Sequence, residues 1–236
     1  SRKKLPVTKK SILAYSTGIF EPFLAYTFTL YGLKFISAGI TAVIFSLESV
    51  FILILSVILF FVKINSPLHF ILLLTGAMAG SIMVALPDIN DRIDNITGYI
   101  LIVAGVLSAS FYVVISSRLI VNFEPVTLLT GQLTFSFILA CFFIVLTGTS
   151  LQLPVESVFL VFLSGILQYF LAFCFYLYSL RWIPVHIAGA MLYFIPLVAL
   201  LLSWFFLQED ISFIQGLGVF ITILCVYILN KKYAIE

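Results

Sequence analysis

The sequence predicts an all-α protein, a polytopic membrane bundle of about eight transmembrane helices. Hydrophobic residues make up 63% of its 236 residues and charged residues only 9%. A soluble domain carries roughly 45–50% apolar and about 25% charged residues, so no soluble fold of this size buries so much apolar surface. The apolar residues form long uninterrupted runs, and basic residues gather at alternate ends of these runs. A spanning helix needs about 20 apolar residues, and eight such helices nearly exhaust the chain.

The apolar runs are each long enough to cross a bilayer as a helix. Transmembrane strands are disfavoured, because they would show segments of about ten residues that alternate between apolar and polar side chains. The longest connector, at 87–97, leaves no room for a separate soluble domain. The runs span residues 11–33, 38–62, 67–86, 97–117, 125–147, 156–179, 185–207 and 212–230.

The basic residues orient the runs. If the N-terminus is cytoplasmic, ten of the twelve Lys and Arg residues fall inside and only Lys34 and Arg92 fall outside. This bias follows the positive-inside rule, so we expect both termini in the cytoplasm of a bacterial cell and the chain in its inner membrane. The net charge of only +2 argues against a nucleic-acid partner. The inside group is Arg2, Lys3, Lys4, Lys9, Lys10, Lys63, Arg118, Arg181, Lys231 and Lys232.

An internal repeat relates two parts of the chain. Residues 18–26 (GIFEPFLAY) align with residues 165–173 (GILQYFLAF) at an offset of 147, and the same offset sets Lys34 against Arg181. A chance match in so apolar a sequence is the alternative. Because an odd number of spans separates the copies, the second copy enters the membrane from the opposite side. Such inverted repeats are typical of secondary transporters.

The repeat divides the chain into two five-helix units. We expect residues 1–96 to form a first repeat that lacks its first two helices, and residues 97–236 to form a complete second repeat. On this interpretation Ser1 follows a second helix, and ten spans are expected in the parent protein, with about 50–60 further residues at about 20 per span. A native eight-span protein is the alternative.

Two segments carry a resemblance to a known family. Residues 178–224 combine a Leu-Arg turn, a helix with a mid-span Pro, an acidic turn and a final helix that contains Gly, and residues 31–61 show the same pattern more loosely. The chain therefore resembles the drug/metabolite transporter superfamily, in its EamA-type branch. The first copy departs from the pattern at Ser49 and Lys63. The resemblance implies ten helices in two inverted halves, a cavity lined by the first four helices of each half, and export or exchange of a small metabolite.

Glu21 is the leading candidate for a substrate-binding residue. It lies about ten residues into its run, near the bilayer midplane, where a charged carboxylate costs at least about 2.5 kcal/mol. Pro22 removes a backbone donor there and favours a kink. At the repeat offset Glu21 corresponds to Gln168, while Thr17 lies one turn earlier and Tyr169 takes the place of Pro22. The alternative is a protonated Glu21 that is hydrogen-bonded to a neighbouring helix, with Gln168 forming hydrogen bonds between helices.

Glu48 is the second carboxylate within a run, and its repeat counterpart is the apolar Ile195. We expect it to contact the solute or, equally, to be a packing or helix-bending feature beside Ser49. A buried carboxylate that exchanges a proton would permit proton coupling, and binding of a cationic amine or an amino-acid ammonium group is the competing use of the same charge.

Three further residues are candidates for solute contact. Tyr112 and Gln132 belong to polar stripes at four-residue spacing on the fourth and fifth runs. Tyr193 precedes the mid-helix Pro196 by three residues and could stack on a solute. Interhelical hydrogen bonding explains the two stripes equally well, and core packing explains Tyr193 equally well.

The function predicted from these features is secondary transport of a small polar or amphiphilic metabolite by alternating access, as an exporter or exchanger. The partners are then a small-molecule solute and the lipid bilayer, with protons as a coupling option and a homodimer left open. No nucleophile and base pair, metal-ligand cluster or ATP-binding loop is present, which argues against an enzyme and against a cofactor or metal. A non-transporting membrane scaffold is the alternative; it predicts paired carboxylates and no solvated cavity.

Overall fold

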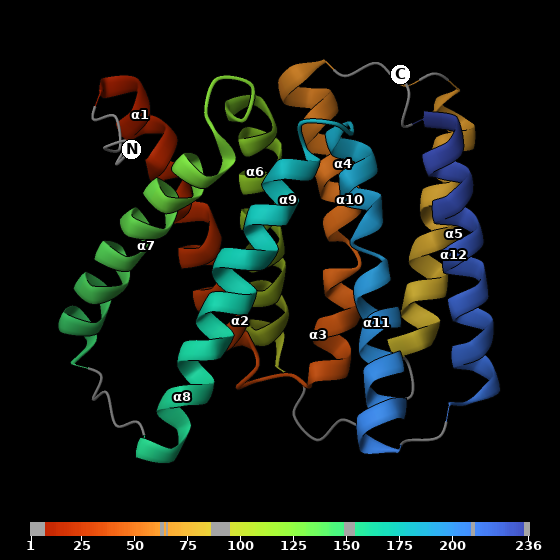
Figure 1. Ribbon diagram of the computed structural model, residues 1–236. Coiled ribbons are helices and arrows are strands. Elements are labelled where there is room, and N and C mark those ends of the chain that lie inside the picture. Colours follow the sequence, from red (N-terminus) through yellow and green to blue (C-terminus); the bar gives the residue numbers. More distant parts are fainter. Residues whose placement is uncertain are drawn as a thin grey trace.

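The computed structural model describes residues 8–61, 64, 66–85, 95–148, 154–208 and 211–233. Every regular element in these ranges is a helix, and the helices run side by side in one bundle (Figure 1). The predicted all-α membrane bundle is confirmed. Lys63, Arg92 and the segment before Thr8, which contribute to the predicted orientation, lie outside the described residues.

Seven segments of the described chain are long and apolar enough to cross a membrane. All seven follow single predicted runs to within a few residues, because hydropathy measured over a window of membrane thickness fixes where each span lies. The segments are Ile40–Phe60, Pro67–Ala85, Ile96–Leu119, Pro125–Thr147, Val155–Ser179, Val185–Phe206 and Phe213–Tyr233.

The first predicted run does not form one continuous helix. It is divided into α1 (Lys9–Tyr15), η1 (Ser16–Ile19), η2 (Phe20–Leu24) and α2 (Ala25–Gly32). Together these pieces pass from one end of the bundle to the other (Figure 1). The interruption lies at Glu21, whose backbone is extended with φ −146° and ψ 131°. A residue before proline is driven from helical toward extended angles, so Pro22 explains the position of this break.

Two other spans are broken near their middles. Helices α3 (Ala38–Phe45) and α4 (Glu48–Phe60) meet at a turn over residues 46–47, and α10 (Val185–Met191) and α11 (Phe194–Leu202) meet at a turn over residues 192–193. The second break comes just before Pro196, which cannot donate to the carbonyl of residue 192. The break at residues 46–47 has no proline near it.

The remaining spans give the bundle its two flanks. Figure 1 shows α7 (Pro125–Thr147) at one side, and α8 (Val155–Ser164), η4 (Gly165–Ala172) and α9 (Phe173–Ser179) run obliquely from that side toward α10. At the other side α5 (Pro67–Ala85) lies against α12 (Phe213–Tyr233), and η5 (Ser203–Leu207) follows α11. Large apolar side chains on α7, α8, α11 and α12 are exposed, as a lipid-facing surface requires.

Helix α6 (Ile96–Leu119) is the most buried span and holds the centre of the bundle. It packs against α2, α3 and α4. The approach to α2 is close because glycines meet there: a Cβ on Gly32 would lie 3.3 Å from the carbonyl oxygen of Gly98. Small residues at such crossings let membrane helices pack backbone to backbone. Helix α6 is thereby fixed beside the two breaks at Glu21 and at residues 46–47.

Candidate functional site

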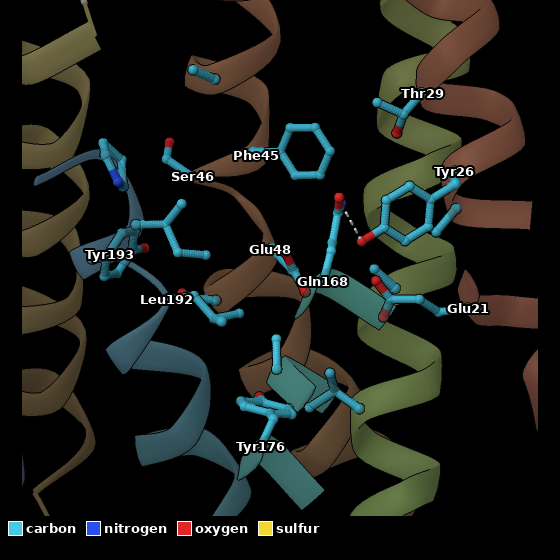
Figure 2. A pocket seen from close by; sticks show the side chains of 18 of the residues that line it. Glu21, Tyr26, Thr29, Phe45, Ser46, Glu48, Gln168, Tyr176, Leu192 and Tyr193 are labelled. Carbon is cyan, nitrogen blue, oxygen red and sulfur yellow. Dashed lines mark hydrogen bonds between the residues drawn. The ribbon is translucent and has the colours of Figure 1, made fainter. Parts of the chain in front are cut away.

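A cavity of about 640 Å³ lies where the broken spans meet α6. Its volume is typical of a site for a small molecule. Figure 2 shows side chains from the first, second, sixth and seventh spans converging on it. The polar lining residues are Glu21, Tyr26, Thr29, Ser46, Glu48, Ser49, Ser81, Gln168, Tyr176 and Tyr193.

Glu21 reaches the cavity from the extended turn that interrupts the first span. Two serine hydroxyls hold the backbone around it: Ser108 Oγ donates to the Phe20 carbonyl at 2.8 Å, and Ser136 Oγ donates to the Gly18 carbonyl at 2.6 Å. The carbonyl of Gly18 lies four residues before Pro22, which has no N–H to donate to it, so Ser136 supplies the hydrogen bond that the helix lacks. The position of Glu21 is therefore set by α6 and α7 rather than by its own side chain.

Glu48 is the first residue of α4, directly after the break in the second span. A carboxylate in the first turn of a helix is favoured by the positive end of the helix dipole. The backbone carbonyl of Glu48 accepts a long hydrogen bond of 3.4 Å from Ser110 Oγ on α6. The next residue, Ser49, donates to the carbonyl of Gly189 on α10. The two broken spans are thus joined beside the carboxylate.

Gln168 lies within the π-helical η4 and points toward the first span (Figure 2). Its Nε2 donates to the hydroxyl of Tyr26 at 3.0 Å. The neighbouring Tyr169 packs its ring on Tyr26 with the centroids 4.8 Å apart, and it does not belong to the described cavity lining. Glu21 and Gln168, which correspond at the repeat offset, both line this cavity, and Tyr26 lies between their segments (Figure 2).

Two tyrosines line the cavity with hydroxyls that make no hydrogen bond within the described part of the chain. They are Tyr176 on α9 and Tyr193 at the break between α10 and α11. Only 1% of the Tyr193 surface is exposed. A buried hydroxyl without a partner costs about 1–3 kcal/mol, which a bound water or solute would recover.

Three predicted solute contacts lie elsewhere, in a buried polar cluster made by Thr17, Tyr112, Ser116 and Gln132. The Gln132 amide accepts from Tyr112 Oη at 3.0 Å and donates to Thr17 Oγ1 at 2.8 Å and to Ser116 Oγ at 3.2 Å. None of the four lines the cavity. Their contacts match the interhelical alternative, since they tie η1, α6 and α7 together.

The cavity is acidic. Glu21 and Glu48 line it, and no Lys, Arg or His does so in the ranges that the structure describes. Within those ranges there is also no group of three or more His, Cys, Asp or Glu side chains that could hold a metal ion. The arrangement can therefore attract positive charge through two carboxylates.

Most of the lining consists of pairs of residues that are 147 positions apart. One member of each pair comes from the first two spans and the other from the sixth and seventh. The pairs are Glu21 with Gln168, Ala25 with Ala172, Tyr26 with Phe173, Thr29 with Tyr176, Phe45 with Leu192, Ser46 with Tyr193, Glu48 with Ile195, and Ser49 with Pro196.

Tyr26, Thr29 and Tyr176 line the cavity and were not predicted. Two of them belong to a regular pattern that starts at a predicted residue: Thr29 follows Glu21 by eight positions, and Tyr176 follows Gln168 by eight positions. Four-residue spacing keeps side chains on one helix face. The sequence therefore contained a signal for Thr29 and Tyr176, namely their spacing from Glu21 and Gln168.

Comparisons with known proteins match most of the chain. The profile of the EamA-like transporter family matches residues 1–86 and 96–231. A protein of Archaeoglobus fulgidus, named an uncharacterized transporter, is 25% identical over 218 residues, which cover 92% of this chain and 77% of the relative. One solved crystal structure shares the fold with a TM-score of 0.80 at 17% sequence identity, and the match covers 96% of this chain and 78% of that one.

Proposed function

Because the chain belongs to the EamA-like transporter family, we propose that this membrane transporter moves a small polar or amphiphilic metabolite by alternating access around the cavity described above. Secondary transport of this kind uses a site near the bilayer midplane, formed by discontinuous helices. Export or exchange is the proposed direction, and proton coupling through Glu21 or Glu48 is the proposed energy source.

The observation that carries this proposal is the acidic cavity at the helix breaks. A scaffold needs no cavity of about 640 Å³ in its interior, and it would pair its buried carboxylates to avoid the cost of unpaired charge. Here Glu21 and Glu48 both line the cavity, and within the described ranges no basic side chain joins them there. These features favour solute binding over a purely structural role.

We further propose two inverted halves, 1–96 and 97–236. The family profile matches in two separate segments, 1–86 and 96–231. The second span is broken at residues 46–47, and the seventh span is broken at residues 192–193. These two spans end at Phe61 and Gln208, which both have left-handed backbone angles and are 147 positions apart. Alternating access would arise as one half rocks against the other around the paired lining residues.

Uptake by the full chain in proteoliposomes tests the proposed function. A screen of labelled metabolites is expected to find a solute whose uptake exceeds that of empty vesicles, and Glu21→Gln is expected to lower this uptake at least about tenfold. The substitution keeps the shape and removes the charge, so it takes away about 1.4 kcal/mol or more of solute or proton binding.

Glu156→Gln is the matched control, because Glu156 is exposed in the first turn of α8 and does not line the cavity. Its uptake should equal that of the native chain. Undiminished uptake by Glu21→Gln would remove Glu21 from the mechanism, and an absence of solute uptake across the screen would contradict transport through this cavity.

A further inference from the structure

We propose that the cavity selects an organic cation, an amine or quaternary ammonium joined to an aromatic or other apolar body. The inference rests on the proposed function, because it names the solute class of the same cavity. Three properties of the lining carry it: the sign of its charge, its aromatic rings and its aliphatic walls.

The charge of the lining excludes anions and favours cations. Glu21 and Glu48 enter from separate spans and have no basic neighbour in the lining, as far as the chain is described. Carboxylates removed from bulk water need a positive partner to offset the loss of hydration. A cationic solute between the two spans supplies that partner. An anionic solute would meet two acidic side chains and, in the described lining, no compensating Lys, Arg or His, which is an arrangement that rejects a wrong ligand.

Aromatic rings stand beside these carboxylates. Tyr26 lies next to Glu21 in Figure 2, and its hydroxyl already accepts a hydrogen bond from Gln168. Phe45 and Tyr176 line the cavity on the side of Glu48 (Figure 2). An ammonium group is attracted to the face of an aromatic ring within about 6 Å of its centroid, and the attraction grows when water is excluded. The rings also offer apolar surface to the rest of the solute.

Part of the lining is aliphatic and suits an apolar body. Ala109 and Val113 of α6 form one wall, and Leu192, Ile195 and Pro196 line the cavity from the seventh span. A polyhydroxylated solute such as a sugar would leave hydroxyls without partners against these walls, which is unfavourable. A solute with one charged end and one apolar end meets both parts of the lining.

Binding of three compounds with one common ring tests the inference. Isothermal titration of the full chain in detergent would compare 2-phenylethylammonium, phenylalanine and 3-phenylpropionate, which carry a positive, a zwitterionic and a negative end. The amine is expected to bind at least about tenfold more tightly than 3-phenylpropionate, a difference of about 1.4 kcal/mol. Phenylalanine is expected to bind more weakly than the amine.

Two charge-removing variants test the site. Glu21→Gln and Glu48→Gln are each expected to weaken binding of the amine about tenfold, and Glu156→Gln is expected to leave it unchanged. Thermal unfolding without a ligand checks that each variant is folded. The comparison of the three compounds on the native chain does not depend on any variant.

The proposal is overturned if either carboxylate-bearing compound binds as tightly as the amine, if the amine shows no measurable binding, or if both Gln variants retain native affinity. These outcomes are separate from those of the uptake assay, because titration requires no transport. Cation binding without any solute uptake would support this inference and contradict the proposed function. Cavity-dependent uptake of a neutral or anionic solute would support the proposed function and contradict this inference.

Discussion

Gln132 is the side chain on which the packing of η1, α6 and α7 converges. It is completely buried, and its amide bonds Thr17, Tyr112 and Ser116. Gln132→Leu keeps the approximate size and removes every one of these bonds. Since interhelical hydrogen bonds in membranes contribute about 0.6 kcal/mol each, and stranded partners add to the loss, we expect the free energy of unfolding to fall by about 1–3 kcal/mol. Thermal unfolding in detergent measures the change.

Thr134→Val is the control for that substitution. Thr134 lies on the same helix, is exposed and bonds only the carbonyl of Thr130 in its own helix. Its replacement should leave the unfolding midpoint nearly unchanged. Equal stability of the Gln132→Leu variant and the native chain would show that the buried amide does not hold the three segments together, and it would reopen a role for Gln132 in solute contact.

The candidate site could be predicted only in part from the sequence. Glu21 and Glu48 stand out because a carboxylate inside an apolar run has few structural uses. Tyr112 and Gln132 produce the same kind of signal, a polar stripe on a helix, yet they satisfy one another away from the cavity. A stripe shows which side chains share a helix face. Whether that face meets another polar helix or a cavity depends on helix packing, which one sequence does not reveal.

At the level of the elements, the spans were predictable and the breaks were only partly so. Hydropathy sums over about 20 residues and is insensitive to a turn of two residues within a span. Pro22 signalled the break at Glu21. The break at residues 46–47 lies in the sequence FSLES, which contains neither proline nor glycine. Its position therefore depends on tertiary contacts such as the bond from Ser49 to Gly189.

The crossing of α5 and α12 makes an element-scale prediction. A Cβ at Gly218 would lie 2.6 Å from the Gly80 carbonyl oxygen and 2.9 Å from the Met83 Cβ, both on α5. Gly218→Ala must push the helices apart, so we expect a loss of about 1–3 kcal/mol in the free energy of unfolding, visible as a lower midpoint in thermal unfolding.

Gly216 offers a matched control on the same helix. Nothing lies within 4 Å of a Cβ built there. Alanine is about 1 kcal/mol more favourable than glycine within a helix, so Gly216→Ala should be neutral or stabilising. A similar loss in both variants would mean that the helix itself, rather than its crossing with α5, is sensitive to the extra methyl group.

For the molecule as a whole, the proposed orientation makes a prediction about chemical accessibility. Glu124 precedes α7 at the end of the bundle where α1 begins, and Glu156 is in the first turn of α8, which begins at the opposite end (Figure 1). Of the described Lys and Arg residues, only Lys34 lies in a connection at the end where α8 begins, namely the one that follows α2 (Figure 1). We therefore expect a membrane-impermeant maleimide added to intact cells to label Glu156→Cys and to label Glu124→Cys only after permeabilisation.

The labelling requires a background in which Cys141, Cys174 and Cys225 are replaced by alanine. These thiols are free in the structure, and Cys141 is exposed. A reversed pattern, with Glu124→Cys labelled in intact cells, would place the ends of the chain outside and contradict the proposed cytoplasmic termini. Equal labelling of both positions before permeabilisation would contradict a single orientation.

The frame around the two carboxylates is built from α6 hydroxyls and backbone carbonyls. Ser108 holds the carbonyl of Phe20, and Ser110 contacts the carbonyl of Glu48. Neither contact uses an acidic side chain, so the scaffold and the selective groups are separable parts. An engineer could exchange the side chains at positions 21 and 48 for neutral or basic ones and redirect the cavity to another chemistry while keeping the architecture that carries them.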